Sequence, residues 1–449
     1  MPADVIVGMQ WGDEGKGKVV DFLAENYNAV VRYGGGSNAG HTVYVGDERL
    51  VLHLLPSGIL HESKNNVLGD GMVIDPVLLA GEIRQLKEKG LLNGNLYVSN
   101  RSQLTLPHYK AIEEERERVL HIGTTGMAIG PTYEFMVNRS GIRVCDLFDE
   151  PSLRERLQQN ITLSRRLLPG GYELDADKLI EKLMEDFEGI AQYVTDTSFL
   201  INKWLEQGKD VLFEGAQGTH LDLTYGTYPH VTSSHPTVGG VSIGAGVGPN
   251  RIRNVYDIFK AYPTRVGAGD FPTELGSIKD VGDVKKDMEV FTGKDKLEMS
   301  YGSEKALSKY IRIKADEYGG TTGRARRIGW PDGVVLLYSK RINGMDRPVI
   351  TRLDVLDQLK RIRLATAYRL NGRVIDEVNE PFPASEAELA ECMPVYEELP
   401  GWEQSTAGVT EYDSLPGNAR RYVERLEELL QLPIHIISTG PRRHETIVR

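Results

Sequence analysis

Seven residues near the N-terminus, Gly12 to Lys18, leave few folds open to this chain. They read Gly-Asp-Glu-Gly-Lys-Gly-Lys and follow Val5-Ile6-Val7, a short β-branched run typical of a buried strand. Residues 18–25 then have the composition of a helix. A strand, a glycine-rich loop and a helix in this order are typical of phosphate-binding α/β proteins, in which loop amides and the positive helix N-terminus face the phosphate.

The same loop departs from the usual phosphate-binding pattern. The residue after Lys18 is Val19, so the hydroxyl that commonly binds Mg²⁺ is missing. Asp13 and Glu14 lie inside the cradle, where a carboxylate repels polyphosphate unless a cation lies between them or the acid has a chemical task. Asp13 suits both roles, because it can hold Mg²⁺ through oxygen and accept a proton. The alternative is a tight turn whose acids are simply exposed to solvent.

Strand-like and helix-like segments alternate along the chain, which favours an α/β fold. Asp75 followed by Pro76 is typical of a helix start, and Gly90 of a helix end. Residues 42–54 alternate apolar and polar side chains on both sides of Gly46-Asp47, as in a hairpin. We therefore expect strands at 29–32, 211–213 and 434–437, a hairpin at 42–54, helices at 77–89 and 418–430, and a helix-rich region at 150–207.

The 449-residue chain has a formal net charge of −11, which argues against a uniformly basic nucleic-acid-binding surface. A few focused lysines and arginines can still bind anionic small molecules. Only Cys145 and Cys392 occur, so we expect no disulfide framework and a reducing compartment. No run approaches the ~20 apolar residues of a membrane span, and no basic segment followed by an apolar stretch begins the chain. We expect a cytoplasmic protein without nucleic-acid or membrane partners.

From the first glycine-rich loop to the C-terminal region, the chain resembles the adenylosuccinate synthetase family. The matching segments occur in the family's order and cover nearly the whole chain. They are GMQWGDEGKGK (8–18), SNAGHT (37–42), HLLPSGIL (53–60), IGTTG (122–126), IGPTYE (129–134), FEGAQGTHLD (213–222), GTYPHVTSS (226–234), VGAGDFPTEL (266–275), TTGRARRIGW (321–330), LDVLD (353–357), PGW (400–402) and ISTGP (437–441). The resemblance implies one α/β domain over residues 1–449, with a large, mostly parallel central sheet flanked by helices, a nucleotide site like that of P-loop GTPases, and a homodimer.

Members of this family join L-aspartate to C6 of inosine monophosphate (IMP) and convert GTP to GDP and phosphate, a reaction of AMP and purine nucleotide biosynthesis. The ring oxygen must be phosphorylated before it can leave, and N1 must lose its proton so that this oxygen can attack. The resemblance implies that Asp13 takes the proton, that His41 hydrogen-bonds the oxygen as an acid, and that Gln217 helps to hold the base. An ordinary aspartate has a pKa of ~3.9, too low to deprotonate the ring unaided, so the oxyanion must be stabilised in place. Asp13 and the backbone carbonyl of Gly40 would hold the Mg²⁺ that neutralises charge.

The resemblance also implies the contacts of GTP. These are Gly12, Gly15, Lys16, Gly17, Lys18, Gly40, Thr42, Arg326, Arg352, Asp354, Ser438 and Gly440. The segment Thr351-Arg352-Leu353-Asp354 resembles the guanine-reading motif T/N-K-x-D, whose carboxylate accepts two N–H groups that guanine offers and adenine does not. Arg352 replaces the motif's lysine. Its planar guanidinium can stack over a base but has a different geometry, so guanine selectivity stays open at this position.

The remaining implied contacts concern IMP and L-aspartate. Those of IMP are Asp13, Lys16, Asn38, His41, Thr125, Arg139, Gln217, Thr232 and Arg324. Asn38, Thr125, Thr232 and Arg139 would hold the 5′-phosphate, and Arg139 would come from the partner subunit, so that an active site is complete only in a dimer. Thr321, Thr322, Gly323 and Arg324 would form a loop over aspartate, because a dicarboxylate needs fork-like donors and arginine supplies them in pairs.

Several features depart from the family. Met127-Ala128 and Met136 stand where Arg-Gly and lysine are common, so positive charge near the substrate pocket is missing. The link over about 276–318 is longer and more charged than usual, with helix-like character at 303–315. We hypothesise that this link covers or orders the loop at 321–324; a surface insertion without a role is the alternative.

Two other functions stay open on these residues. The missing basic side chains leave room for a related ligase that acts on another 6-oxopurine nucleotide, such as GMP or dGMP. A regulatory GTP-binding protein without ligase activity is the second, although the histidine loop at 37–42 and the loop at 321–324 argue against it. A panel of IMP, GMP and dGMP as substrates separates the two ligases, and full GTP hydrolysis without IMP and aspartate would favour the regulatory protein.

Overall fold

The computed structural model describes residues 3–46, 48–168, 170, 172–277, 284, 286, 289–319 and 323–449. The chain divides into two units. Unit 1 comprises Met1–Ile6, Lys16–Gln217 and Thr232–Asn254, and unit 2 comprises Val7–Gly15, Gly218–Val231 and Val255–Arg449. The first glycine-rich loop contributes to both units, because Gly15 ends a segment of unit 2 and Lys16 begins one of unit 1.

Unit 1 contributes six of the ten strands of the main sheet, and these six run parallel. Their order is β1-β10-β2-β5-β7-β9. In one row of the register Val5 pairs with Phe213, Phe213 with Val31, and Val31 with Val67, and all four side chains are buried. Continuous runs of Val and Ile are what a parallel sheet covered on both faces requires. The strands are β1 (Ala3–Gly8), β10 (Val211–Glu214), β2 (Ala29–Arg32), β5 (Asn65–Leu68), β7 (Asn95–Ser99) and β9 (Val194–Thr195).

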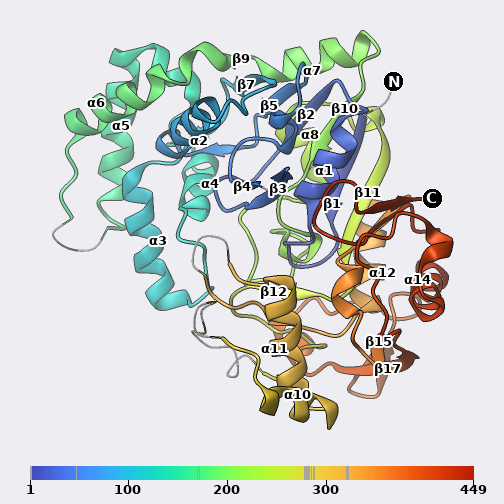
Figure 1. Ribbon diagram of the computed structural model, residues 1–449. Coiled ribbons are helices and arrows are strands. Elements are labelled where there is room, and N and C mark those ends of the chain that lie inside the picture. Colours follow the sequence, from blue (N-terminus) through green and yellow to red (C-terminus); the bar gives the residue numbers. More distant parts are fainter. Residues whose placement is uncertain are drawn as a thin grey trace. The chain divides into compact units, whose positions relative to one another are not determined.

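The helices of unit 1 follow local start signals and bury apolar faces. Asp75 caps α2 by accepting a hydrogen bond from the N–H of Leu78 at 3.2 Å, and Pro76 takes the first helical position. Helices α5 and α6 pack together (Figure 1), and Leu153 and Leu183 on them join the core of this unit. The helices are α1 (Lys16–Ala24), α2 (Pro76–Glu88), α3 (Pro107–Leu120), α4 (Ile129–Val137), α5 (Glu150–Ser164), α6 (Ala176–Glu188), α7 (Thr197–Glu206) and α8 (Gly239–Ala245).

Two short strand pairs complete unit 1. Strands β3 (His41–Val45) and β4 (Glu48–Leu52) form the predicted hairpin, in which His41 lies opposite Leu52. The turn residue Asp47 lies outside the described residues. Strands β6 (Val73–Ile74) and β8 (Gln103–Leu104) pair in parallel. The hairpin matters most for function, because it carries His41 at its first position.

Unit 2 contributes four further strands in the order β19-β18-β14-β11, of which only the pair of β18 and β19 is antiparallel. A separate antiparallel sheet has the order β16-β15-β17, and β12 pairs antiparallel with β13. The strands are β11 (Ile252–Lys260), β14 (Arg347–Thr351), β18 (Ile436–Ser438), β19 (Thr446–Val448), β16 (Arg373–Ile375), β15 (Arg361–Leu370), β17 (Met393–Pro400), β12 (Thr264–Arg265) and β13 (Arg327–Ile328).

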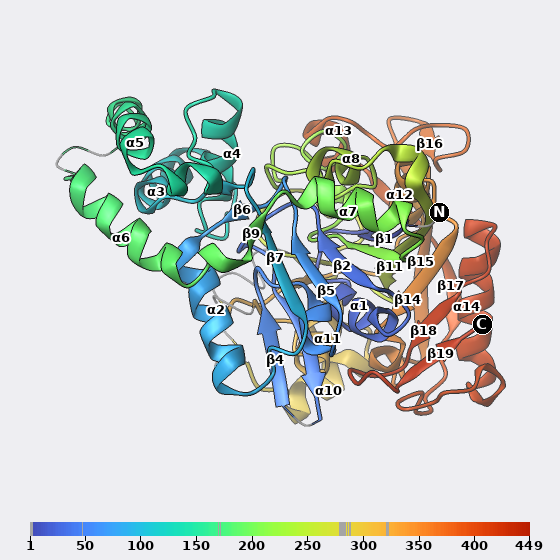
Figure 2. The same ribbon diagram turned by 90° about the horizontal axis from the view of Figure 1, so that it is seen from above.

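The helices of unit 2 include two that lie within the charged link of the sequence. Helices α10 (Gly293–Ser300) and α11 (Glu304–Ala315) occupy its second half and pack together. Helices α12 (Gly333–Asn343) and α14 (Gly417–Leu430) also pack on each other (Figures 1 and 2), and Leu336 and Leu426 on them belong to the same apolar core. The short helix α13 (Glu386–Ala390) precedes β17.

The predicted α/β class, with a large, mostly parallel sheet flanked by helices, is confirmed. The expected strands and helices occur within about two residues of their predicted bounds, including the helix expected at 303–315, which is α11. The region at 150–207 is helix-rich as expected, with α5, α6 and α7. Among the described residues, no helix is long and apolar enough to cross a membrane.

Candidate active site

The two acids of the first glycine-rich loop have different environments. Glu14 is fully buried, and its Oε1 accepts hydrogen bonds from the N–H groups of Gln10 and Gly12, both at 3.0 Å. Asp13 is exposed and has a left-handed backbone with φ of 58°. Such a conformation is costly for a residue with a Cβ and is concentrated at functional sites. Glu14 therefore shapes the loop, and Asp13 is presented outward by it.

Asp13 is paired with an arginine that belongs to a buried charge cluster in unit 2. Nε of Arg326 lies 2.8 Å from Oδ2 of Asp13, and its Nη1 lies 2.6 Å from Oε2 of Glu317. Nζ of Lys260 and the hydroxyl of Tyr262 donate to the other oxygen of Glu317 at 3.1 and 2.9 Å. Although burial opposes ionisation, Lys260, Arg326 and Arg352 hold the pKa of Glu317 well below its ordinary value. Sequence reasoning missed Lys260 and Glu317, which no motif marks.

His41 is held by a carboxylate in unit 1. Nδ1 of His41 is hydrogen-bonded to Oε1 of Glu214, at the end of β10. Glu214 also accepts from the backbone N–H and the hydroxyl of Ser57, at 2.9 and 2.8 Å. Burial lowers the pKa of His41, and the negative charge of Glu214 opposes that shift. Glu214 was not predicted as a site residue, although the segment FEGAQG that contains it was noted.

Gly17 of the first loop packs against this histidine. A Cβ added at Gly17 would lie 3.0 Å from Cβ of His41, closer than ordinary side-chain packing allows. Lys16 is buried and is one of the positive charges that lower the pKa of His41, together with Arg32. Glycine at position 17 thus allows the first turn of α1 to pass the start of β3, which keeps Lys16 and His41 in the same region of unit 1.

The glycine-rich loop at residues 34–40 of unit 1 lies beside Thr232, so two of the residues predicted to bind the IMP phosphate come together. Oδ1 of Asn38 accepts from the N–H of Gly36 at 3.1 Å, and Nδ2 of Asn38 lies 3.4 Å from Oγ1 of Thr232. Gln217 has a left-handed backbone with φ of 56°, and its buried Oε1 has no hydrogen-bond partner among the described residues. A buried amide oxygen without a partner is costly, which suits an acceptor that awaits a substrate group.

Thr125 and Arg139, the other two predicted phosphate ligands, are exposed on unit 1, and among the described residues neither is hydrogen-bonded to Asn38 or Thr232. The backbone of Arg139 is left-handed with φ of 70°, just after α4. Among the departures from the family, Met136 is exposed, and Ala128 is buried with its N–H donating to Glu113 at 2.7 Å. Thr321 and Thr322 lie outside the described residues, whereas Gly323 and Arg324 are described.

The guanine-like motif forms a turn after β14 in unit 2. The hydroxyl of Thr351 donates to the backbone carbonyl of Glu14 at 2.6 Å, which ties this turn to the first loop. Burial raises the pKa of Asp354, and its Oδ1 has no hydrogen-bond partner among the described residues. Nη1 of Arg352 donates to the carbonyl of Ala315 at 3.1 Å. At the position where the sequence predicts guanine, the structure therefore presents a carboxylate oxygen that no described residue hydrogen-bonds.

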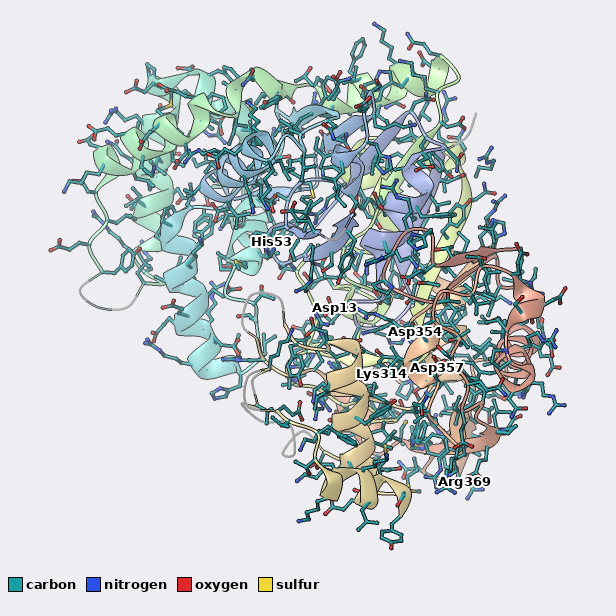
Figure 3. All side chains as sticks on the ribbon, in the orientation of Figure 1. Asp13, His53, Lys314, Asp354, Asp357 and Arg369 are labelled. Atoms are coloured by element: carbon teal, nitrogen blue, oxygen red, sulfur yellow. The ribbon has the colours of Figure 1, made fainter. Side chains whose placement is uncertain are left out.

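A lysine that sequence reasoning missed also contacts this turn. Nζ of Lys314, on α11, donates to the backbone carbonyl of Asp354 at 2.7 Å. Figure 3 shows Lys314, Asp354 and Asp357 close together, whereas Arg369 lies apart from them. The hydroxyl of Ser438 donates to the carbonyl of Gly440 at 3.1 Å, and both residues are buried. The turn is thus braced from α11 by a contact that no local pattern indicates.

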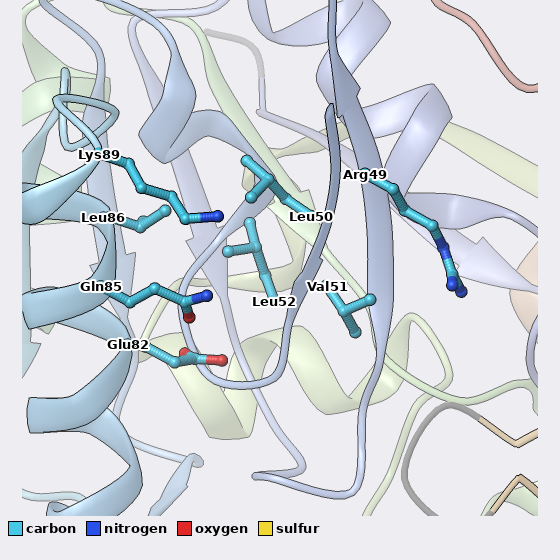
Figure 4. Close-up of a pocket in the computed structure, with 8 residues that line it drawn as sticks. All are labelled: Arg49, Leu50, Val51, Leu52, Glu82, Gln85, Leu86 and Lys89. Carbon is cyan, nitrogen blue, oxygen red and sulfur yellow. The ribbon is translucent and has the colours of Figure 1, made fainter. Parts of the chain in front are cut away.

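A surface hollow of unit 1 is lined by the strand that pairs with the start of β3. It is lined by residues of β4 and α2, with an empty volume of about 340 Å³ (Figure 4). Lys89, one of its lining residues, is ion-paired with Glu48. None of its lining residues was predicted to bind substrate. Within the described parts of the chain, no cluster of three His, Cys, Asp or Glu side chains is arranged to hold a metal.

Comparison with known proteins identifies similar chains over the full length. A family model described as adenylosuccinate synthetase matches residues 5–447. The adenylosuccinate synthetase of Carboxydothermus hydrogenoformans is 47% identical over 454 aligned positions, covering 100% of this chain and 99% of the relative. That of Geobacillus kaustophilus is 45% identical with the same coverage.

Two solved structures are also similar. Fully ligated adenylosuccinate synthetase from Plasmodium falciparum matches with a TM-score of 0.88 and 35% identity, covering 100% of this chain and 99% of that one. The succinoaminodeoxyadenylate synthetase of cyanophage S-2L, bound to dGMP and dATP, has a TM-score of 0.57 and 17% identity, covering 100% of this chain and 95% of that one. At that identity only the fold is shared.

Proposed function

This chain belongs to the adenylosuccinate synthetase family, and on that basis we propose which of its residues perform the reaction. The enzyme is a ligase that joins L-aspartate to C6 of IMP and consumes GTP in purine nucleotide biosynthesis. The observation that carries this function is the match of the whole chain to relatives of that name. The relatives give no support to a ligase for GMP or dGMP or to a regulatory GTP-binding protein.

Asp13 is the proposed base of the first step. It accepts the N1 proton of IMP, the electrons move to O6, and O6 attacks the γ-phosphorus of GTP so that the bond to the β-phosphate oxygen breaks. The outward position of Asp13 on a loop shaped by Glu14 supports this role. The ion pair of Asp13 with Arg326, whose Nε lies 2.8 Å from Oδ2, orients the carboxylate.

His41 is proposed to donate a hydrogen bond to the 6-oxygen as negative charge develops there. Its Nδ1 is engaged by Glu214, so Nε2 is the ring nitrogen available for the substrate, and it donates when His41 is protonated and its charge is balanced by Glu214. Gln217 is proposed to hold the base near His41, and its buried Oε1 without a partner supports a polar contact with a ligand. In this scheme His41 supplies the donor for the developing oxyanion, and Gln217 supplies an acceptor for a polar group of the purine.

Mg²⁺ is proposed to bind through Asp13 and the backbone carbonyl of Gly40. Both are hard oxygen donors, the side chain of Asp13 is 33% exposed, and Gly40 is exposed, so the residues present fit this ion. When bound, Mg²⁺ neutralises charge on the transferring phosphoryl group. Mg²⁺ commonly takes one or two protein ligands and completes its shell with phosphates and water, so a larger protein cage is not required.

In the second step the amine of L-aspartate attacks C6. The C–N bond forms, the C6–O bond breaks, phosphate leaves with that oxygen, and the amine loses a proton. We propose that Arg324 pairs with the carboxylates of aspartate, together with Thr321, Thr322 and Gly323. Arg324 is exposed and precedes Arg326 by two residues, which supports a position next to the charge cluster of Asp13.

The nucleotide contacts are proposed from two motifs. The amides and lysines of the first loop hold the GTP phosphates, with Thr42 and Arg326 nearby, and Asp354 reads the guanine edge. The buried Oδ1 of Asp354 supports this reading, because guanine N–H groups would satisfy it. Ser438 and Gly440 are proposed to contact the base, and the burial of both residues is compatible with a packed base site.

The proposed IMP phosphate ligands require a second copy of the chain. Asn38 and Thr232 lie 3.4 Å apart, which supports a shared anion, whereas Arg139 is exposed. We propose a homodimer in which Arg139 reaches the partner's site, and a cytoplasmic location for the enzyme.

The decisive experiment mixes purified protein with GTP, Mg²⁺, IMP and L-aspartate and identifies the product by mass. Adenylosuccinate, GDP and phosphate in equal amounts are expected. Parallel reactions with GMP and dGMP in place of IMP are expected to give no condensation product. Complete GTP hydrolysis in the absence of IMP and aspartate would contradict the ligase assignment.

A further inference from the structure

The segment that carries Arg324 and Arg326 is held in place by an ion pair from the charged link that precedes it. We call residues 323–327 the arginine arm. We propose that Glu289 and Arg312 are positioning residues, which hold the arginine arm in the conformation that binds L-aspartate. This inference rests on the proposed role of Arg324 in aspartate binding.

Glu289 and Arg312 form a bidentate, nearly buried ion pair. Nε and Nη2 of Arg312 lie 2.9 and 2.8 Å from Oε2 and Oε1 of Glu289, and the two side chains are only 4% and 7% exposed. The hydroxyl of Tyr318 donates to Oε2 of Glu289 at 2.6 Å. Two parallel hydrogen bonds fix the plane of the guanidinium as well as its position, and exclusion of water strengthens them.

The remaining nitrogen of the same guanidinium, Nη1, is hydrogen-bonded to the arginine arm. Nη1 of Arg312 donates to the backbone carbonyl of Arg326 at 3.2 Å and to the hydroxyl of Ser308 at 3.0 Å. That carbonyl belongs to the residue whose side chain pairs with Asp13 and Glu317. A displacement of Arg312 would therefore move the backbone of Arg326, whose side chain contacts Asp13 in the first glycine-rich loop.

The backbone of the arginine arm is also bonded on both of its edges. The N–H of Ala325 donates to the carbonyl of Val284 at 2.9 Å, and the N–H of Lys286 donates to the carbonyl of Gly323 at 3.3 Å. The N–H of Arg326 donates to the carbonyl of Glu317 at 2.9 Å. The first part of the charged link, at Val284 and Lys286, thus supplies one edge, and Glu317, just after α11, supplies the other. The pair of Glu289 and Arg312 joins these two parts of the link.

A second ion pair in the same link provides a matched control. Nζ of Lys309, on α11, lies 2.9 Å from Oδ2 of Asp295, on α10. This pair also ends on α11, and its side chains are 24% and 17% exposed. Among the described residues, neither side chain contacts residues 323–327. Its removal should perturb α10 and α11 without altering the arginine arm.

The test compares Glu289→Gln with Asp295→Asn in the full-length protein. For Glu289→Gln we expect the KM for aspartate to rise about tenfold or more, because loss of one partner leaves the other buried and unpaired. The KM for IMP should stay within about twofold, because most of its proposed contacts come from unit 1. Hydrogen exchange of the amides at 323–327, measured without substrates, should accelerate, while Asp295→Asn changes neither quantity.

The proposal is overturned if Glu289→Gln and Asp295→Asn have the same aspartate KM, or if exchange at 323–327 is unaltered. Should Glu289→Gln fail to fold, Tyr318→Phe, which removes only one hydroxyl donor to Glu289, is judged by the same two measurements. A wild-type protein without ligase activity would refute the proposed function, whereas the exchange measurement tests the positioning of the arginine arm independently of any reaction.

Discussion

Arg326 holds Asp13 through its Nε, which lies 2.8 Å from Oδ2 of the carboxylate. Another nitrogen of the same guanidinium pairs with Glu317, which is buried and also accepts hydrogen bonds from Lys260 and Tyr262. The proposed base is therefore oriented by a cluster that is assembled before any substrate is present. Preorganised groups of this kind need no rearrangement during the reaction, which is why they accelerate it.

Asp13→Asn is expected to lower kcat by at least about a thousandfold, because asparagine cannot accept the N1 proton. Folding should be retained, since Arg326 keeps its bond with Glu317 and Glu14 still holds the loop. Steady-state kinetics and a thermal unfolding curve check both statements. Asp413→Asn, at an exposed acid paired with Arg420, is the control and should behave as wild type. Appreciable turnover by Asp13→Asn would remove the proposed base.

His41→Asn should reduce kcat by about a hundredfold to ten-thousandfold, the usual contribution of a positioned proton donor. The KM for GTP should change much less, because the phosphates are bound mainly by the first loop in the proposed scheme. Single-turnover measurement of phosphoryl transfer to IMP locates the defect. A variant that loses only GTP affinity would argue that His41 binds nucleotide and takes no part in the chemistry.

Asp354→Asn is expected to weaken the binding of GTP and to make XTP a better substrate relative to GTP. The carboxylate accepts two N–H groups of guanine, whereas an asparagine amide can donate to the 2-oxo group of xanthine. A site built around such hydrogen bonds discriminates strongly against the wrong base, so a shift of about a hundredfold or more in the ratio of kcat/KM values is anticipated. If kcat/KM fell by the same factor for both nucleotides, Asp354 would shape the turn without recognising the base.

Mixing two inactive variants tests the shared active site. Arg139→Ala and Asp13→Ala should each be inactive alone. After random exchange of subunits, about a quarter of all sites carry both wild-type residues, because half of the dimers are mixed and one of their two sites is intact. Recovery of roughly that fraction of wild-type activity is expected. Native mass spectrometry shows whether mixed dimers have formed. If they have formed and no activity is recovered, Arg139 does not contribute to the partner's active site.

Asp332 gives a stability prediction independent of function. Burial raises the pKa of this carboxyl to about 6, although Tyr368 donates to it at 2.6 Å. Because the pKa of Asp332 is higher in the folded than in the unfolded state, its protonation stabilises the fold. This stabilisation is complete below the pKa that Asp332 has in the unfolded chain, and it is lost as the pH rises through about 6. Asp332→Asn keeps an acceptor for the N–H groups of Val334 and Val335 and removes the ionisation.

The free energy of unfolding of the wild type, relative to Asp332→Asn, should therefore fall by about 1 kcal/mol between about pH 5 and about pH 7.5. Urea unfolding curves of the two proteins at both pH values measure this difference. A difference that is constant with pH would show that Asp332 is ionised throughout.

Local patterns were sufficient for the elements that form the framework. The strand, loop and helix around Gly12, the cap at Asp75 and the helix ending at Ala315 were all predictable, because their signals lie within a few residues of the element they define. Asn38 and Thr232, predicted to share one ligand, also lie within reach of each other in the structure.

The partners of charged side chains could not be predicted in this way. Asp13 and Glu14 are adjacent acids in one loop, yet one turns outward and the other caps buried amides. Glu214 meets His41 from 173 residues away, and Glu289 reaches the arginine arm through Arg312. Sequence alone thus determined the α/β framework, the phosphate-loop pattern and the family, because these depend on short-range signals and ordered motifs. Tertiary structure decided which carboxylate pairs with which cation, because the energy of a buried charge depends on groups that only long-range packing brings near it.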